Sequence, residues 1–131
     1  MTSEYIRTYN SRMINVDLAT IVTGTILLFL IDLPWLYVNQ SWAGTMLRNI
    51  QKSAVELRIF PAVLVYVFLS YLLLIPKSYG EAFLLGVSVY GVYDATNYST
   101  LKNYSPYFAV ADTVWGGVLM STGWWIKKHY L

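Results

Sequence analysis

Long apolar stretches constrain this chain more than any other feature of its sequence. They run over residues 16–38, 57–75, 80–98 and 107–126. A hydrocarbon core of ~30 Å requires about 20 apolar residues per helix, and each stretch approaches or exceeds that length. The composition agrees, because 56% of the residues are hydrophobic and only 12% are charged. We therefore expect an all-α, multi-pass integral membrane protein in which residues 16–131 form a single four-helix transmembrane bundle.

The segments on either side of the first span are more polar than the span itself. Residues 1–15 are mixed in charge and suit either a short helix on the membrane surface or simple disorder. The span 16–38 is too long for the apolar core of a signal peptide and has no small-residue cleavage site, so we expect it to stay as an anchor. From Ser41 to Glu56, apolar residues recur every four positions. This spacing predicts an interfacial amphipathic helix capped by Ser41 between the first two spans, with a polar loop as the alternative.

The lengths of the connections predict a topology. Short turns join the second, third and fourth spans, so we expect these three to be antiparallel neighbours. An even number of spans places both termini on one side of the membrane. Lysine and arginine are slightly more numerous on that side, which favours cytoplasmic termini under the positive-inside rule.

The residue inventory excludes several kinds of chemistry. Cysteine is absent, and the single histidine, His129, lies close to the C-terminus. Disulfides, thiolate metal sites, haem ligation by paired histidines and Ser-His-Asp catalysis therefore lack their residues. The net charge of +2 is too small and too scattered to indicate a nucleic-acid partner. The sequence indicates no cofactor, identifies no metal site and is more typical of a non-enzyme.

Aspartates inside the spans are the strongest functional signal, because a charged side chain there costs about 2.5–3.5 kcal/mol. Asp32, Asp94 and Asp112 each lie about five residues from the middle of their span, which is ~7 Å from the midplane at 1.5 Å per residue. The fourth span runs opposite to the first and third, so all three displacements point the same way. We expect the three carboxylates to share one layer on the side opposite the termini.

Polar and aromatic residues are expected to surround this layer. On the third span, polar positions follow helical spacing and predict one face turned inward. Arg58 lies near the interface, from which its long side chain can reach down toward the carboxylates. The predicted ligand-binding or ion-binding residues are Asp32, Asp94, Asn97 and Asp112, and the residues expected to support them are Trp35, Arg58, Tyr66, Tyr90, Tyr93, Thr96 and Trp115.

The chemistry of such a layer allows three interpretations. Three carboxylates in a low-dielectric setting cannot all be ionised, so they would titrate as a coupled set, which favours proton storage or exchange. Their oxygens, with the amide of Asn97, are also the ligands that a hard cation prefers. In the third interpretation these groups only hold the bundle together, through interhelical hydrogen bonds that contribute on the order of 0.6–2 kcal/mol each.

Motifs in a fixed order carry a resemblance to a known family. They are Asp32-Leu-Pro-Trp35, Pro61-Ala62, Gly91-Val-Tyr93-Asp94-Ala-Thr96-Asn97-Tyr-Ser-Thr100-Leu101-Lys102 and Asp112-Thr-Val-Trp115-Gly116. Together they resemble the predicted membrane protein family catalogued as domain of unknown function 2177, over about residues 16–126. The resemblance implies a four-helix membrane fold and carries no activity over to this chain. The chain departs from the family at Ala95 and Tyr98, where the family often has a longer aliphatic residue.

These observations lead to one functional hypothesis and two alternatives. We expect a small membrane protein that binds or transports a proton, a cation or a small polar solute through the aspartate cluster. The first alternative is a structural or accessory subunit of a membrane assembly. The second is a membrane enzyme that acts on a lipid and uses a carboxylate as general acid or base. The expected partner is the lipid bilayer, with a homo-oligomer or a larger membrane assembly also consistent with so small a chain.

Overall fold

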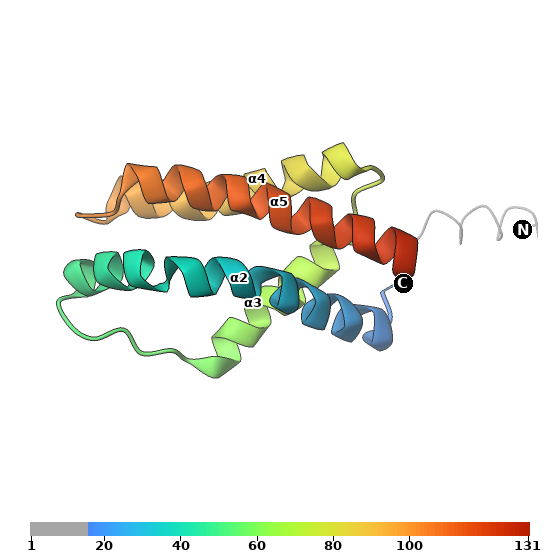
Figure 1. Ribbon diagram of the computed structural model, residues 1–131, viewed down its shortest axis with the longest axis horizontal. Coiled ribbons are helices and arrows are strands. Elements are labelled where there is room, and N and C mark those ends of the chain that lie inside the picture. The colour runs from blue at the N-terminus through green and yellow to red at the C-terminus, as the bar shows by residue number, and fades with distance from the viewer. Residues whose placement is uncertain (1–15) are drawn as a thin grey trace, which may run out of the picture.

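A computed structural model describes residues 16–131, and this part of the chain contains four helices and no strand (Figure 1). With the labels of Figure 1, the helices are α2 (Leu18–Gln51), α3 (Ile59–Leu72), α4 (Tyr79–Thr100) and α5 (Pro106–Tyr130). The prediction of an all-α chain with four helices is confirmed for these residues. The prediction for residues 1–15 lies outside the described part of the chain.

The helices form two hairpins that meet along α2 and α5. In one hairpin α4 packs closely against α5, and in the other α3 packs against α2 (Figure 1). Within residues 16–131, no comparable backbone approach joins α3 to α4, so the prediction that the second and third spans are neighbours is wrong. The reason is geometric, because α3 has only 14 residues and crosses α2 obliquely before residues 73–78 carry the chain over to α4.

Local sequence explains where most of the helices begin. Asp17, Ser78 and Ser105 stand immediately before α2, α4 and α5, and each side chain accepts a hydrogen bond from a backbone N–H three residues later. These bonds satisfy amide groups that the first turn of a helix leaves without partners. Pro106 occupies the first turn of α5, where its missing N–H costs least. The cap positions therefore set the register of three of the four helices.

Helix α2 continues through the segment that was expected to form a separate interfacial helix. Its 34 residues run without interruption to Gln51, and it ends where Lys52 adopts a left-handed conformation at φ 62°. The prediction of an independent helix over Ser41–Glu56 is therefore wrong. No helix-breaking residue lies between the apolar and the amphipathic parts. At their boundary the polar side chain of Asn39 donates to the Trp35 carbonyl at 3.0 Å, so it is accommodated within the helix.

The helices differ in how well they match a membrane. By length and apolar composition, α2 is the one helix in residues 16–131 that suffices to cross a membrane. Helix α3 is apolar, but its 14 residues extend only ~21 Å. Helices α4 and α5, with 22 and 25 residues, are long enough but less apolar.

Two apolar clusters fill the interior. The larger, which we call the leucine cluster, joins α2, α3 and α5 and consists of Leu28, Leu69, Leu73, Leu119 and Met120, none more than 4% exposed. The smaller, which we call the Tyr104 cluster, consists of Met46, Tyr104 and Phe108. Along α2, Leu28 precedes Asp32 and Met46 follows it, so the two clusters flank this aspartate on opposite sides.

Candidate functional site

The three aspartates that the sequence analysis singled out are all buried where the two hairpins meet. Asp32 on α2 is 4% exposed, Asp94 on α4 is 0% exposed and Asp112 on α5 is 8% exposed. The carboxyl group of Asp112 neighbours that of Asp94 and also lies within the electrostatic influence of Asp32. The fold therefore brings these residues together from three different helices, and we call the group the aspartate layer.

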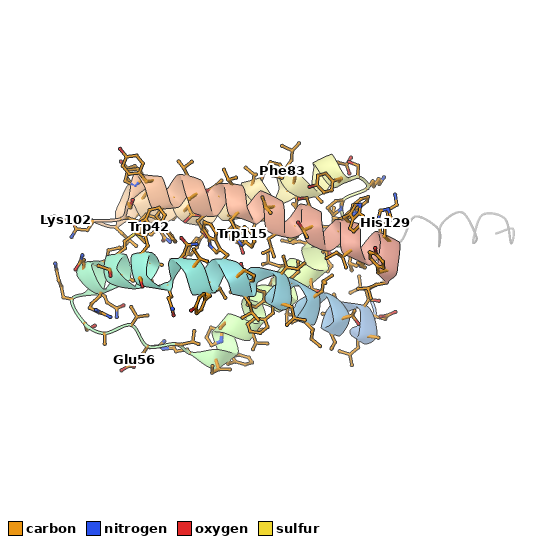
Figure 2. The ribbon with its side chains drawn as sticks, viewed as in Figure 1. Trp42, Glu56, Phe83, Lys102, Trp115 and His129 are labelled. Carbon is orange, nitrogen blue, oxygen red and sulfur yellow. The ribbon has the colours of Figure 1, made fainter. Side chains whose placement is uncertain are left out.

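Helices α2 and α5 exchange hydrogen bonds across their interface. The indole N–H of Trp115 donates to Asp32 Oδ1 at 2.6 Å, and the indole N–H of Trp35 donates to Asp112 Oδ1 at 3.2 Å. The two indole rings are stacked, with centroids 5.2 Å apart and planes 6° from parallel. Figure 2 shows Trp115 between the hairpins. In each helix the tryptophan follows its aspartate by three residues, so both side chains lie on the same face.

Helix α3 reaches the layer through one residue. The hydroxyl of Tyr66 donates to Asp32 Oδ2 at 2.5 Å. Both carboxylate oxygens of Asp32 therefore have a neutral donor, from Tyr66 on one side and Trp115 on the other. This arrangement ties α2, α3 and α5 together at a single carboxylate.

Asp94 is held by two residues that sequence reasoning missed. The hydroxyl of Tyr104 donates to Asp94 Oδ1 at 2.7 Å, and that of Thr113 donates to Asp94 Oδ2 at 3.4 Å. Tyr104 lies in the turn between α4 and α5, where Asn103 adopts a left-handed φ of 70°. Asparagine tolerates this conformation, so the Asn103-Tyr104 pair was a usable signal for a turn that directs the next residue inward.

The protonation state of Tyr104 follows from its surroundings. Burial raises the pKa of the Tyr104 phenol, and its hydrogen bond to Asp94 acts in the same direction, while an interaction with Asn97 opposes both. The phenol therefore stays protonated at neutral pH. It serves as a neutral donor to Asp94.

Glycines allow α4 and α5 to approach closely beside the layer. A Cβ atom at Gly86 would lie 2.1 Å from the carbonyl oxygen of Gly116, and one at Gly116 would lie 2.3 Å from the ring of Tyr90. Tyr90 is partly buried and packs against the leucine cluster. The close approach places Asp94 next to Asp112.

Four predicted residues form no hydrogen bond to the aspartates, namely the predicted binding residue Asn97, which interacts with Tyr104 instead, and the predicted supporting residues Tyr93, Thr96 and Arg58. Tyr93 is 59% exposed, Thr96 is also exposed and Asn97 is half-buried. The expectation that this whole face of α4 turns inward is wrong, because Asp94 points at α5 and a step of 100° per residue carries Tyr93 and Thr96 around to the outside. Arg58 is exposed at the start of α3, since the non-helical residues 52–58 lead it to the outer side of the hairpin.

The donors around the aspartate layer carry no charge. They are the indole, phenol and hydroxyl groups of Trp35, Trp115, Tyr66, Tyr104 and Thr113. Within residues 16–131, neither Arg58 nor another basic side chain forms an ion pair with these carboxylates. The same residues bring no three His, Cys, Asp or Glu side chains into an arrangement able to hold a metal ion. Burying three charges under these conditions would be costly, so protonation is the direct way to lower their charge.

Comparison with known proteins gives one result. A family model described as "Predicted membrane protein (DUF2177)" matches residues 17–127. No curated protein and no solved structure matches the chain.

Proposed function

The chain belongs to the DUF2177 family of predicted membrane proteins, and on that premise we propose that its aspartate layer binds protons and moves them across the membrane. One observation carries the proposal. The three aspartates are no more than 8% exposed, and within residues 16–131 every hydrogen-bond donor to them is neutral. In this proposal all four described helices cross the membrane, and the first residue of α2 lies at the same side as the C-terminus.

The hydrogen bonds support a division of roles within the layer. Asp32 accepts from Tyr66 and Trp115, so both of its oxygens are already occupied by hydrogen-bond donors. Asp112 accepts a hydrogen bond through Oδ1 only, from Trp35, among the described residues. Its carboxyl group neighbours that of Asp94. Because two adjacent carboxylates at low dielectric are not ionised together, Asp94 and Asp112 share the exchangeable proton.

The orientation of the donors favours a proton over a metal cation as the bound species. A cation needs carboxylate oxygens that are free to point at it, whereas the oxygens of Asp32 and Asp94 already face the N–H and O–H groups of their partners. Those positive hydrogen ends repel a cation placed among them. A proton requires no such reorganisation on Asp112, because it binds at Oδ2, which accepts from no described donor, while Oδ1 keeps its hydrogen bond from Trp35.

A purely structural role would use the same hydrogen bonds, so the test must separate charge from hydrogen bonding. Asparagine keeps a carbonyl oxygen that accepts from Tyr104 but cannot release a proton. The Asp94→Asn variant should therefore keep much of the packing while it loses titration. A matched control is Glu56→Gln, which neutralises an exposed carboxylate in the α2–α3 connection.

Proton flux in reconstituted vesicles tests the proposal. An imposed potassium diffusion potential drives protons, and an entrapped pH-sensitive dye reports their entry. The proposal predicts flux for the unchanged protein and for Glu56→Gln, and loss of flux for Asp94→Asn and Asp112→Asn at equal protein content. Equal flux in all four proteins, or none above empty vesicles in the unchanged protein, would refute it.

A further inference from the structure

Tyr90 of α4 lies against the backbone of α5 beside the aspartate layer. A side chain at Gly116 would collide with the Cβ atom and the ring of Tyr90, so the tyrosine occupies the space that this glycine leaves open. Gly116 follows Trp115, the donor to Asp32, and comes one helical turn after Asp112. The ring of Tyr90 is therefore held next to the part of α5 that contacts Asp32 and carries Asp112.

The hydroxyl of Tyr90 lies within the electrostatic influence of all three aspartates. Among them Asp32 of α2 acts on it most strongly, followed by Asp112 of α5 and by Asp94, which lies one turn further along α4. The phenol of Tyr66, from α3, also acts on it. We call Asp94 and Asp112 the carboxyl pair. Groups from all four described helices therefore converge on this hydroxyl, with Asp32 from one hairpin and the carboxyl pair from the other.

Tyr90 differs from the two tyrosines that bind the layer. Tyr66 donates to Asp32 and Tyr104 donates to Asp94, whereas the hydroxyl of Tyr90 forms no hydrogen bond within residues 16–131. In this part of the chain no fully buried side-chain nitrogen or oxygen lacks a partner, so the Tyr90 hydroxyl keeps some accessible surface. Since its hydrogen turns about the C–O bond, the hydroxyl is free to face one acceptor or another.

From this placement we propose that the hydroxyl of Tyr90 relays protons between the carboxyl pair and Asp32. The inference rests on the proposed function, because it concerns one step of the same proton movement, from the α4–α5 hairpin to the α2–α3 hairpin. The step begins when a second proton reaches the pair, so the pair keeps its shared proton afterwards.

The transfer breaks and forms two O–H bonds. The O–H bond of Asp112 breaks as its proton bonds to the phenol oxygen of Tyr90, while the O–H bond of Tyr90 breaks as its proton bonds to Asp32. Tyr90 ends neutral, and the net change is one proton moved from Asp112 to Asp32. The tyrosine hydroxyl suits this step because it both donates and accepts.

The partners of Asp32 allow it to receive this proton. Trp115 donates to Oδ1 and Tyr66 donates to Oδ2. When Oδ2 is protonated, the hydroxyl of Tyr66 can turn and accept, so the hydrogen bond between the two residues is kept while Trp115 stays in place. Within residues 16–131 no basic side chain forms an ion pair with Asp32 that would hold it ionised. The layer thus contains two proton sites, the carboxyl pair and Asp32, with Tyr90 between them.

Tyr90→Phe tests the relay, because it keeps the ring against Gly116 and removes only the hydroxyl. The full-length protein is assayed for proton flux in reconstituted vesicles, and for bound protons by the protonated-carboxyl band in infrared spectroscopy. We expect flux to fall by roughly tenfold or more, since a positioned proton-transfer group typically contributes about 10²–10⁴-fold. The carboxyl band and the unfolding midpoint in detergent should not change, because the lost hydroxyl forms no hydrogen bond within residues 16–131. Tyr98→Phe is the control on the same helix, at a position 54% exposed, and should keep full flux.

Asp32→Asn tests the other end of the relay. Asparagine keeps an oxygen that accepts a hydrogen bond but cannot bind the transferred proton. This variant should lose flux and keep the carboxyl band at neutral pH, because that band belongs to the carboxyl pair. A merely structural role of Tyr90 and Asp32 does not predict this separation of flux from proton binding.

The outcomes separate the relay from the proposed function. If Tyr90→Phe or folded Asp32→Asn carries the flux of the unchanged protein, the relay is wrong while proton transport stands. If Tyr90→Phe loses the carboxyl band, its hydroxyl acts on proton binding and the relay is again wrong. If the unchanged protein carries no flux above empty vesicles, the proposed function fails and the relay falls with it.

Discussion

Replacing Gly86 with alanine tests the close approach of α4 and α5 beside the aspartate layer. The new Cβ would lie 2.1 Å from the Gly116 oxygen and 2.9 Å from the Gly117 Cα, and because observed Cβ contacts are essentially never under 3.0 Å, the helices must separate by about 0.9 Å. The obstructing atoms are backbone, so no side-chain rotation relieves them. We take the overpacking cost as about 3 kcal/mol. The helix-propensity gain of about 1 kcal/mol offsets part of it, which leaves a net loss of about 2 kcal/mol.

Gly91→Ala is the matched control on the same helix. Its Cβ would meet only the Thr113 Cγ2 at 3.5 Å, an ordinary van der Waals distance, so the propensity gain should stabilise the protein by up to about 1 kcal/mol. Denaturant unfolding in detergent, followed by tryptophan fluorescence, measures both variants. The reasoning predicts a difference of about 3 kcal/mol between them, the sum of the two estimates. Equal effects of the two substitutions would refute the close backbone approach.

Three further predictions concern individual residues. Trp115→Phe removes the donor to Asp32 but keeps an aromatic ring, so it should lower the unfolding free energy by about 0.6–1.7 kcal/mol. It should also abolish the exciton signal of the stacked indole pair in circular dichroism. Leu28→Ala should cost about 2–5 kcal/mol in the same unfolding assay, whereas Leu30→Ala, at a position 55% exposed, should change stability by no more than about 0.5 kcal/mol. Arg58→Gln should leave both proton flux and the carboxyl band unchanged, and a large loss of either would show that Arg58 pairs with the layer after all.

Depth and spacing arguments located the three aspartates from the sequence alone. Asp32 and Asp112 each precede a tryptophan by three residues, which places both side chains on one helical face. Helical spacing does not predict which aspartate each tryptophan binds. In the structure each tryptophan binds the aspartate of the other helix. That pairing depends on how α2 and α5 lie against each other, and tertiary packing decides it.

Tertiary packing also explains the predictions that were wrong and the residue that was not predicted. Ser41 is a favourable cap residue, yet nothing before it stops α2, so the helix continues to Gln51. Thr96 is polar and close in sequence to Asp94, but only the residues that face α5 are covered by protein. Tyr104 lies between the predicted third and fourth spans, and helical spacing does not connect it with Asp94, whereas in the fold it follows the left-handed Asn103 and its hydroxyl binds the buried Asp94.

The central claim is that the aspartate layer holds a proton at neutral pH, and infrared difference spectroscopy of the purified protein tests it most directly. We predict a protonated-carboxyl band at neutral pH that disappears in Asp94→Asn and in Asp112→Asn, because each substitution removes one member of the pair that shares the proton. The band should persist in Glu56→Gln. Absence of the band in the unchanged protein, or its persistence in both aspartate variants, would contradict the account.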